Sequence, residues 1–158
     1  MADRPAFHRQ IRLARSAYAQ PGAVCAVTIA VQGRRPVFDD KRFAKDAVNV
    51  LRNLVEHDHV SVFGYCVMPD HVHLVLEPGS ESDIVSFVAR YKSLVQRSLW
   101  SLGLSGTFWQ KSFWDHFLRG DEAVGHVVQY VLNNPVRKGM VADWKDYPFS
   151  GSLVWDLR

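Results

Sequence analysis

The chain has 158 residues, of which 47% are hydrophobic and 22% charged, a balance typical of one globular domain that buries roughly 70% of its unfolded surface. Its apolar runs are far shorter than the roughly 18 consecutive residues that a membrane-spanning helix needs, which excludes a transmembrane protein. With 19 Lys and Arg against 16 Asp and Glu, the net charge is only +3, so nucleic-acid binding is one option among several. Residues 1–15 are basic and lack the apolar core of a secretory signal, and we expect a cytoplasmic protein.

The first half of the chain predicts a strand, a helix and a β-hairpin. Residues 23–31 are rich in β-branched side chains and follow a Pro-Gly turn, which favours a strand. Asp39 and Asp40 can cap a helix that runs to about residue 57, because apolar residues recur there at three- and four-residue spacing. Residues 60–68 and 71–77 are apolar and separated by a tight turn, so we expect them to pair.

The second half predicts two more helices around an aromatic-rich segment. Ser80 or Ser82 can cap a long helix with an apolar stripe. Residues 107–119 can hold one or two short strands, and a last helix over residues 122–133 is stopped by Pro135. The order β, α, β, β, α, β favours an α+β, ferredoxin-like antiparallel sheet with two main helices on one face and a C-terminal helical extension.

We expect residues 1–158 to form a single domain. Within it, residues 1–20 form a basic N-terminal arm and residues 121–158 the C-terminal extension.

The sharpest local motif is the sequence MPDHVHLVL at residues 68–76. On a strand, residues two apart share a face, so His71 and His73 project together while Val72, Leu74 and Leu76 point the other way into the core. Two imidazoles on one face suit a divalent metal and leave coordination positions free for water, another ligand or phosphate oxygens. The same pattern also fits two half-exposed histidines on a sheet surface. Asp70 fits a turn residue or a carboxylate that orients a ligating histidine.

This motif resembles the HUH motif, two histidines flanking a hydrophobic residue, of the single-tyrosine, IS200-like transposases, and in particular of the REP-associated tyrosine transposases of bacteria. Further blocks that resemble this family occur in family order along nearly the whole chain. They are Tyr18 with residues 20–22, residues 109–111, Asp115 with His116, residues 133–137, and Tyr147 and Pro148 with Ser150.

The resemblance implies a ferredoxin-like nuclease domain that acts on single-stranded DNA beside hairpin-forming repeats. In that family the paired histidines hold Mg²⁺ or Mn²⁺, and a tyrosine attacks the scissile phosphate to leave a 5′-phosphotyrosine and a free 3′-OH. A phenol with a pKa near 10 is a weak nucleophile, so a metal that withdraws charge from the phosphate makes chemical sense. The implied partner is single-stranded or hairpin DNA and not a membrane. The implied state is a monomer or homodimer at the bacterial nucleoid.

Tyr91 is the candidate nucleophile, because it is the only tyrosine on the predicted helix after the histidine strand. Another alignment, through Lys92, puts Leu94 at the position of the tyrosine, and the nucleophile would then be lost. Members of the family often take a further metal ligand near the tyrosine. The candidates for it are Gln96, one residue beyond the first turn after Tyr91, and His116.

Seven basic residues are candidate DNA contacts, although each also fits an ordinary solvated charge. They are Arg34, Arg35, Arg90, Lys92, Lys111, Arg137 and Lys138. Three functions stay open at this point: a DNA strand transferase, a non-catalytic nucleic-acid-binding descendant, and a metal phosphoesterase that uses water.

Overall fold

The structure is a computed structural model that describes residues 14–119 and 122–158. In these ranges, five antiparallel strands form one sheet in the order β4-β1-β3-β2-β5. The strands are β1 (Cys25–Ala30), β2 (Ser61–Met68), β3 (His71–Glu77), β4 (Trp114–Phe117) and β5 (Ser150–Gly151). The α-helices are α1 (Lys41–Asp58), α2 (Ile84–Ser101), α3 (Val124–Leu132) and α4 (Asn134–Arg137). Short 3₁₀-helices are formed by Arg15–Ala19, Gln32–Arg34, Val37–Asp39 and Trp144–Asp146.

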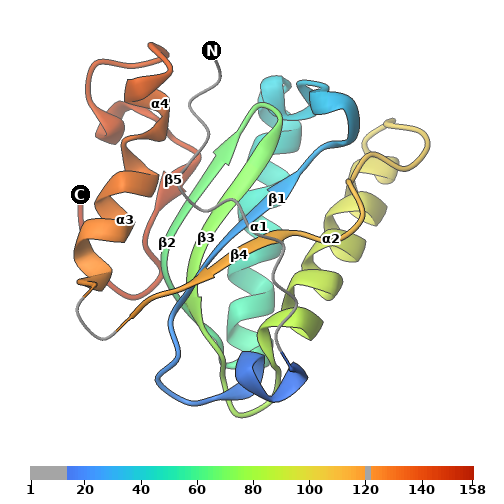
Figure 1. Ribbon diagram of the computed structural model, residues 1–158. Coiled ribbons are helices and arrows are strands. Elements are labelled where there is room, and N and C mark those ends of the chain that lie inside the picture. Colours follow the sequence, from blue (N-terminus) through green and yellow to red (C-terminus); the bar gives the residue numbers. More distant parts are fainter. Residues whose placement is uncertain (1–13, 120–121) are drawn as a thin grey trace.

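Helices cover both faces of the sheet. Helices α1 and α2 lie against one face, and α3 and α4 lie on the other, beside β2 (Figure 1). The first four strands and the two long helices follow the predicted order, so the ferredoxin-like α+β fold is confirmed. The strand β5 adds to the edge at β2.

Alternation along the strands divides the interior into two clusters. On β3, Val72, Leu74 and Leu76 pack in the larger cluster under α1 and α2. Val75 packs in a smaller cluster beneath α3. His71 shares the parity of Val75, and so both histidines of the motif face the α3 side.

Two helix ends differ from the sequence-based prediction. Asp83, not Ser80 or Ser82, caps α2, because its carboxylate accepts a hydrogen bond of 2.7 Å from the backbone N–H of Ser86. Pro135 does not end the helical path but lies in the first turn of α4, where its missing N–H costs no hydrogen bond.

Helix α3 approaches β2 closely at Gly64. A Cβ at this glycine would lie 3.0 Å from Cγ1 of Val128, so the absence of a side chain lets α3 settle on the sheet. Among the described helices, none combines the length and apolarity that crossing a bilayer requires. Residues 1–13 of the predicted N-terminal arm lie outside the described residues.

Candidate functional site

His71 and His73 lie together on the α3 side of the sheet, as their spacing predicts. Both are buried, with 7% and 6% of their surface exposed. Their Nε2 atoms are 3.0 Å apart, and the two rings meet edge to face. The two imidazole nitrogens therefore converge on one point at the start of β3.

A third polar group reaches the same point from the start of α4. The side-chain amide of Asn134, itself buried, lies 3.4 Å from Nε2 of His71. Helix α4 lies beside the upper end of the β2–β3 hairpin in Figure 1, where this contact forms. The site is thus built from two layers: the histidines come from the sheet and the amide from the helices above it.

The three groups fit a divalent cation in chemistry and in spacing. Two ligand atoms bound at about 2.1 Å and at right angles lie about 3.0 Å apart, which is the separation of the two imidazole nitrogens. Within the described residues no cluster of three or more His, Cys, Asp or Glu side chains could hold a metal. The third ligand here would be an amide oxygen of Asn134, a donor that hard divalent cations accept.

The surroundings keep His73 neutral. Burial, with the neighbouring His71 and the charges of Arg137, Arg34 and Lys138, holds the pKa of His73 well below its usual value. A neutral imidazole keeps the lone pair that a metal needs. The three cations that act on His73 were all predicted DNA contacts, and the structure brings them around the site.

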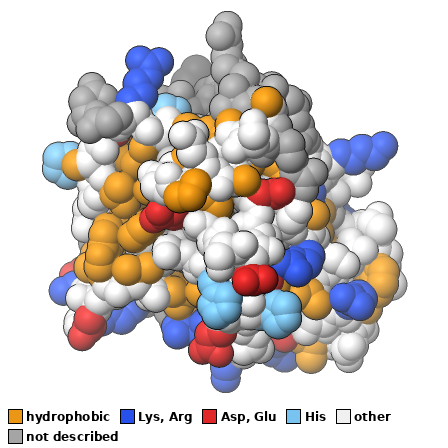
Figure 2. Space-filling view, turned by 90° about the horizontal axis from the view of Figure 1, so that it is seen from below, with side chains coloured by type: hydrophobic (Ala, Val, Ile, Leu, Met, Phe, Trp, Pro, Cys, Tyr) orange, Lys and Arg blue, Asp and Glu red, His pale blue; other side chains and the backbone are white. Residues whose placement is uncertain are grey.

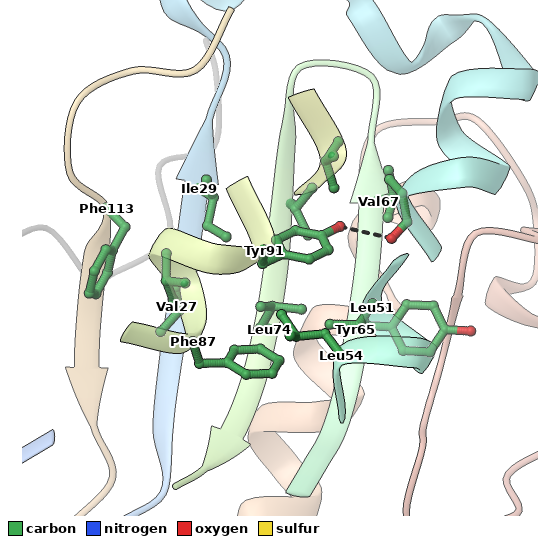
Figure 3. Close-up of a cluster of buried hydrophobic side chains, with 14 of the residues drawn as sticks. Val27, Ile29, Leu51, Leu54, Tyr65, Val67, Leu74, Phe87, Tyr91 and Phe113 are labelled. Carbon is green, nitrogen blue, oxygen red and sulfur yellow. Dashed lines mark hydrogen bonds between the residues drawn. The ribbon is translucent and has the colours of Figure 1, made fainter. Parts of the chain in front are cut away.

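Tyr91 lies on the other side of the sheet. It is fully buried on α2, among the apolar residues between that helix and the strands (Figure 3). Its hydroxyl donates a hydrogen bond of 3.1 Å to the carbonyl of Ala47 on α1. Burial, and then the charges of Asp46 and Tyr65, raise the pKa of Tyr91 well above its usual value. The expectation that Tyr91 attacks a phosphate at the histidines is therefore corrected, because the sheet stands between them.

The other predicted ligands are not brought to the histidines either. Gln96 lies on α2, across the sheet like Tyr91. His116 lies on β4, opposite Ala26 of β1, and so two strands away from β3. Its Nε2 atom lies 3.1 Å from the carboxylate of Glu122.

Two predicted DNA contacts tie parts of the fold together. Arg90 forms an ion pair with the buried Asp58 at the end of α1. The ammonium of Lys92 donates to the carbonyls of Gln110 and Ser112, at 2.7 Å and 3.0 Å, and holds the segment before β4. Arg90 and Lys92 both lie on α2, on the face of the sheet away from the histidines, so their assignment as DNA contacts is corrected.

Arg35 and Lys111 are exposed, and the guanidinium of Arg35 reaches the carbonyl of Thr107 at 3.4 Å. Their role as DNA contacts stays a prediction.

Two tyrosines lie on the histidine side of the sheet: Tyr130 on α3, and Tyr147, which is buried in the smaller cluster. All five tyrosines lie within the described residues, and Tyr130 alone among them is partly exposed. It lies on α3, four residues before Asn134, so the two side chains leave the helical path on the same side. The guanidinium of Arg137 lies 3.7 Å from the centre of the Tyr130 ring, and the same Arg137 is near enough to His73 to affect its pKa.

Sequence reasoning missed Tyr130 and Asn134, although a signal for them was present. The family places a polar ligand near its tyrosine, and one helical turn after a tyrosine is four residues. Of the five tyrosines only Tyr130 has a polar side chain at that distance; the residues four beyond the others are Gly22, Pro69, Val95 and Gly151. Residues 133–137 resemble the family, but the sequence alone does not show that Asn134 contacts the histidines.

The comparisons with known proteins show the family of the chain. Residues 23–134, more than half of the chain, match the family "Transposase IS200 like". The chain belongs to the IS200-like transposase family. The match begins just before β1 and ends at Asn134, so it includes every residue of the candidate site except Arg137 and Lys138. Membership of this transposase family makes the chain a DNA-processing enzyme by descent.

Two bacterial relatives of this transposase-like chain carry the same description, REP-associated tyrosine transposase. One, from Haemophilus influenzae, is 28% identical over 145 residues, which are 82% of this chain and 79% of the relative. The other, from Escherichia coli K12, is 32% identical over 87 residues, which are 54% of this chain and 50% of the relative.

Solved structures of transposases show the same fold. The structure of a REP-associated tyrosine transposase bound to a REP hairpin superimposes with a TM-score of 0.68 at 25% identity, over 88% of this chain and 81% of the other. A crystal structure of a transposase from Deinococcus radiodurans gives a TM-score of 0.53 at 23% identity, over 70% of this chain and 88% of the other, and supports the fold alone.

Proposed function

We propose that this chain cleaves and rejoins single-stranded DNA beside hairpin-forming repeats, with Tyr130 as the nucleophile. The observation that carries the proposal is the contact of Asn134 with His71. It brings the helical path that bears Tyr130 onto the histidine pair, so a phenol, two imidazoles and an amide lie on one side of the sheet. The description of the relatives as tyrosine transposases supports a tyrosine in this role.

His71, His73 and Asn134 would hold the divalent cation, for which we propose Mg²⁺ or Mn²⁺. When bound, such a cation would withdraw electron density from the scissile phosphate. The residues of the chain supply the rest of the chemistry. The oxygen of Tyr130 forms a bond to phosphorus while the bond from phosphorus to the 3′-oxygen breaks, which leaves a 5′-phosphotyrosine and a free 3′-OH. The phenolic proton passes to water, and the departing 3′-oxygen takes a proton from water. Attack by another 3′-OH reverses the step: its proton passes to water, and Tyr130 leaves and is reprotonated.

The positive charges around the histidines support a nucleic-acid substrate. Arg34, Arg137 and Lys138 all act on His73, and phosphate contacts by such residues bring affinity that depends on salt. The REP hairpin bound by the structural relative supports hairpin DNA as the partner. We expect the protein to act on chromosomal DNA in the bacterial cytoplasm, as a monomer or homodimer.

The test uses an end-labelled oligonucleotide that carries a hairpin with single-stranded flanks, incubated with the protein and Mn²⁺. We expect an adduct that survives denaturing electrophoresis, is lost in Tyr130→Phe and persists in Tyr91→Phe. An adduct that persists in Tyr130→Phe contradicts the assignment. Cleavage without an adduct would indicate the water-using phosphoesterase, and binding without cleavage over a panel of repeats would indicate the non-catalytic descendant.

A further inference from the structure

A continuous chain of hydrogen bonds passes through both imidazoles. It ends on Asp70 and Thr28, which are not among the proposed metal ligands. Oδ1 of Asp70 lies 2.6 Å from Nδ1 of His71. Nε2 of His71 lies 3.0 Å from Nε2 of His73, and Nδ1 of His73 lies 3.0 Å from Oγ1 of Thr28. Each histidine is therefore held on the ring nitrogen that points away from the common centre.

The chemistry of the two end groups decides where the protons are. The carboxylate oxygen of Asp70 at 2.6 Å, with the guanidinium of Arg34 near its second oxygen, accepts a hydrogen bond from His71, so His71 carries its proton on Nδ1 and presents a lone pair on Nε2. His73 then donates from Nε2 to that lone pair, and its Nδ1 accepts from the hydroxyl of Thr28.

A divalent cation needs a lone pair on both Nε2 atoms. His71 already has it. His73 must carry its proton on Nδ1 instead, and a threonine hydroxyl can accept there as well as donate. Thr28 can therefore support His73 in either tautomer, whereas Asp70 supports only one tautomer of His71.

The backbone holds both end groups in place. Thr28 lies on β1 directly opposite His73 in the strand register. The turn that bears Asp70 is fixed by two backbone hydrogen bonds of 2.9 Å, from Val31 to the carbonyl of Asp70 and from Phe38 to that of Pro69. The guanidinium of Arg34 lies 3.8 Å from the second carboxylate oxygen of Asp70.

From this geometry we propose that Asp70 and Thr28 are the positioning residues of the centre. They hold the two imidazoles by their Nδ1 atoms, set the ring tautomers and leave the Nε2 atoms to a divalent cation. The inference rests on the proposed function in one respect only, that the histidine pair takes a metal.

The experiment measures the tautomers and the metal affinity separately. Long-range ¹H–¹⁵N spectra of the metal-free protein show which nitrogen of each imidazole carries the proton, and titration with Mn²⁺ followed by electron paramagnetic resonance gives the affinity. The variants are Asp70→Ala, Thr28→Val and the conservative Thr28→Ser. Matched controls are Asp115→Ala on β4, which pairs with Val27 of the opposite sheet face, and Thr107→Val in an exposed segment.

We expect Asp70→Ala to mix the tautomers of His71, Thr28→Val to alter those of His73, and each to weaken Mn²⁺ binding by about 10- to 100-fold. Thr28→Ser and the two controls should keep wild-type affinity and spectra. Unchanged tautomers and affinity in Asp70→Ala and Thr28→Val would overturn the inference. If the variants alter the tautomers but the wild-type protein binds no Mn²⁺, the positioning roles are supported and the metal of the proposed function is contradicted.

Discussion

Tyr91 and Tyr130 have opposite surroundings. The surroundings of Tyr91 are those of a core residue, and those of Tyr130 fit a nucleophile. Tyr91 is buried between α2, on which it lies, and the sheet, and burial disfavours the phenolate that an attack requires. Tyr130 is partly exposed on α3 and carries the guanidinium of Arg137 over its ring. A cation over an aromatic face is attractive, so Arg137 holds the ring of Tyr130 in place. Tyr130 is therefore accessible to a substrate, whereas Tyr91 is not.

Tyr91→Phe should lower stability without lowering activity. The substitution removes the hydrogen bond to the carbonyl of Ala47, and we expect a loss of about 1 kcal/mol in the free energy of unfolding. Urea denaturation measures the loss, and adduct formation with the hairpin oligonucleotide should match the wild type. A Tyr91→Phe variant of full stability that forms no adduct would contradict a purely structural role.

Lys138→Gln should weaken hairpin binding in a salt-dependent way. Lys138 is exposed beside α4 and acts on His73, so it is placed to contact a phosphate. Losing one such contact lowers the slope of log affinity against log salt by about 0.7 to 0.9. Fluorescence anisotropy over a salt series measures the slope. The control Lys45→Gln, exposed on α1 across the sheet, should leave it unchanged, and an equal effect of both variants would argue against a local contact.

Among the elements, α1 and α2 are joined by an ion pair whose acidic member is buried. Asp58 has none of its surface exposed, and Arg90 of α2 is its charged partner. Nδ1 of His57 also contacts Asp58, at 2.9 Å. Removing one partner of a buried pair leaves a charge without compensation, which costs more than the pair contributes.

Arg90→Ala should therefore destabilise the fold while leaving DNA binding intact. We expect the free energy of unfolding to fall by about 2 kcal/mol, less than for a fully buried pair because the guanidinium is half exposed. Thermal and urea denaturation measure the loss, and anisotropy with the hairpin measures affinity at a temperature where the variant is folded. A stable variant with weakened hairpin affinity would restore Arg90 as a DNA contact.

The elements themselves could be predicted from local patterns, but the side of the sheet on which each helix packs could not. The alternation after Pro69 predicts β3 at its observed bounds, His71–Glu77, and the shared face of the two histidines. The spacing of Val88, Tyr91 and Val95 on the apolar stripe of α2 already indicates a core position for the tyrosine. Periodicity shows which face of a helix is apolar, and it says nothing of which sheet face that helix covers. The meeting of Asn134 with His71, 63 residues apart, depends on that choice.

For the whole molecule, the candidate site is a junction between two layers rather than a feature of one segment. The histidines belong to the sheet, whereas Tyr130 and Asn134 belong to the α3–α4 layer above it. Charge of one sign does not cover the whole described surface. At the end away from the β2–β3 turn, acidic and basic side chains are interspersed (Figure 2). A net charge of +3 is enough when cations gather at the junction.

Gly64→Ala tests the contact between the sheet and α3 at a position that is not one of the proposed site residues. The added methyl would lie 3.0 Å from Cγ1 of Val128, and we expect it to displace α3 and lower stability by about 1 kcal/mol, with reduced adduct formation. Adding Val128→Ala removes the opposing methyls and should recover much of the activity. Denaturation and adduct yield of the single and double variants give the coupling energy between positions 64 and 128. Strictly additive losses would argue against the idea that this contact positions α3 for the site.

The most direct measurement is to locate the DNA on the protein. The wild-type chain is incubated with the hairpin oligonucleotide and Mn²⁺, the adduct is digested with protease and nuclease, and mass spectrometry identifies the residue that bears the nucleotide. We predict a nucleotide linked through a 5′-phosphate to Tyr130 on the peptide that also contains Asn134. A nucleotide linked to Tyr91, or to any residue other than Tyr130, would contradict the assignment.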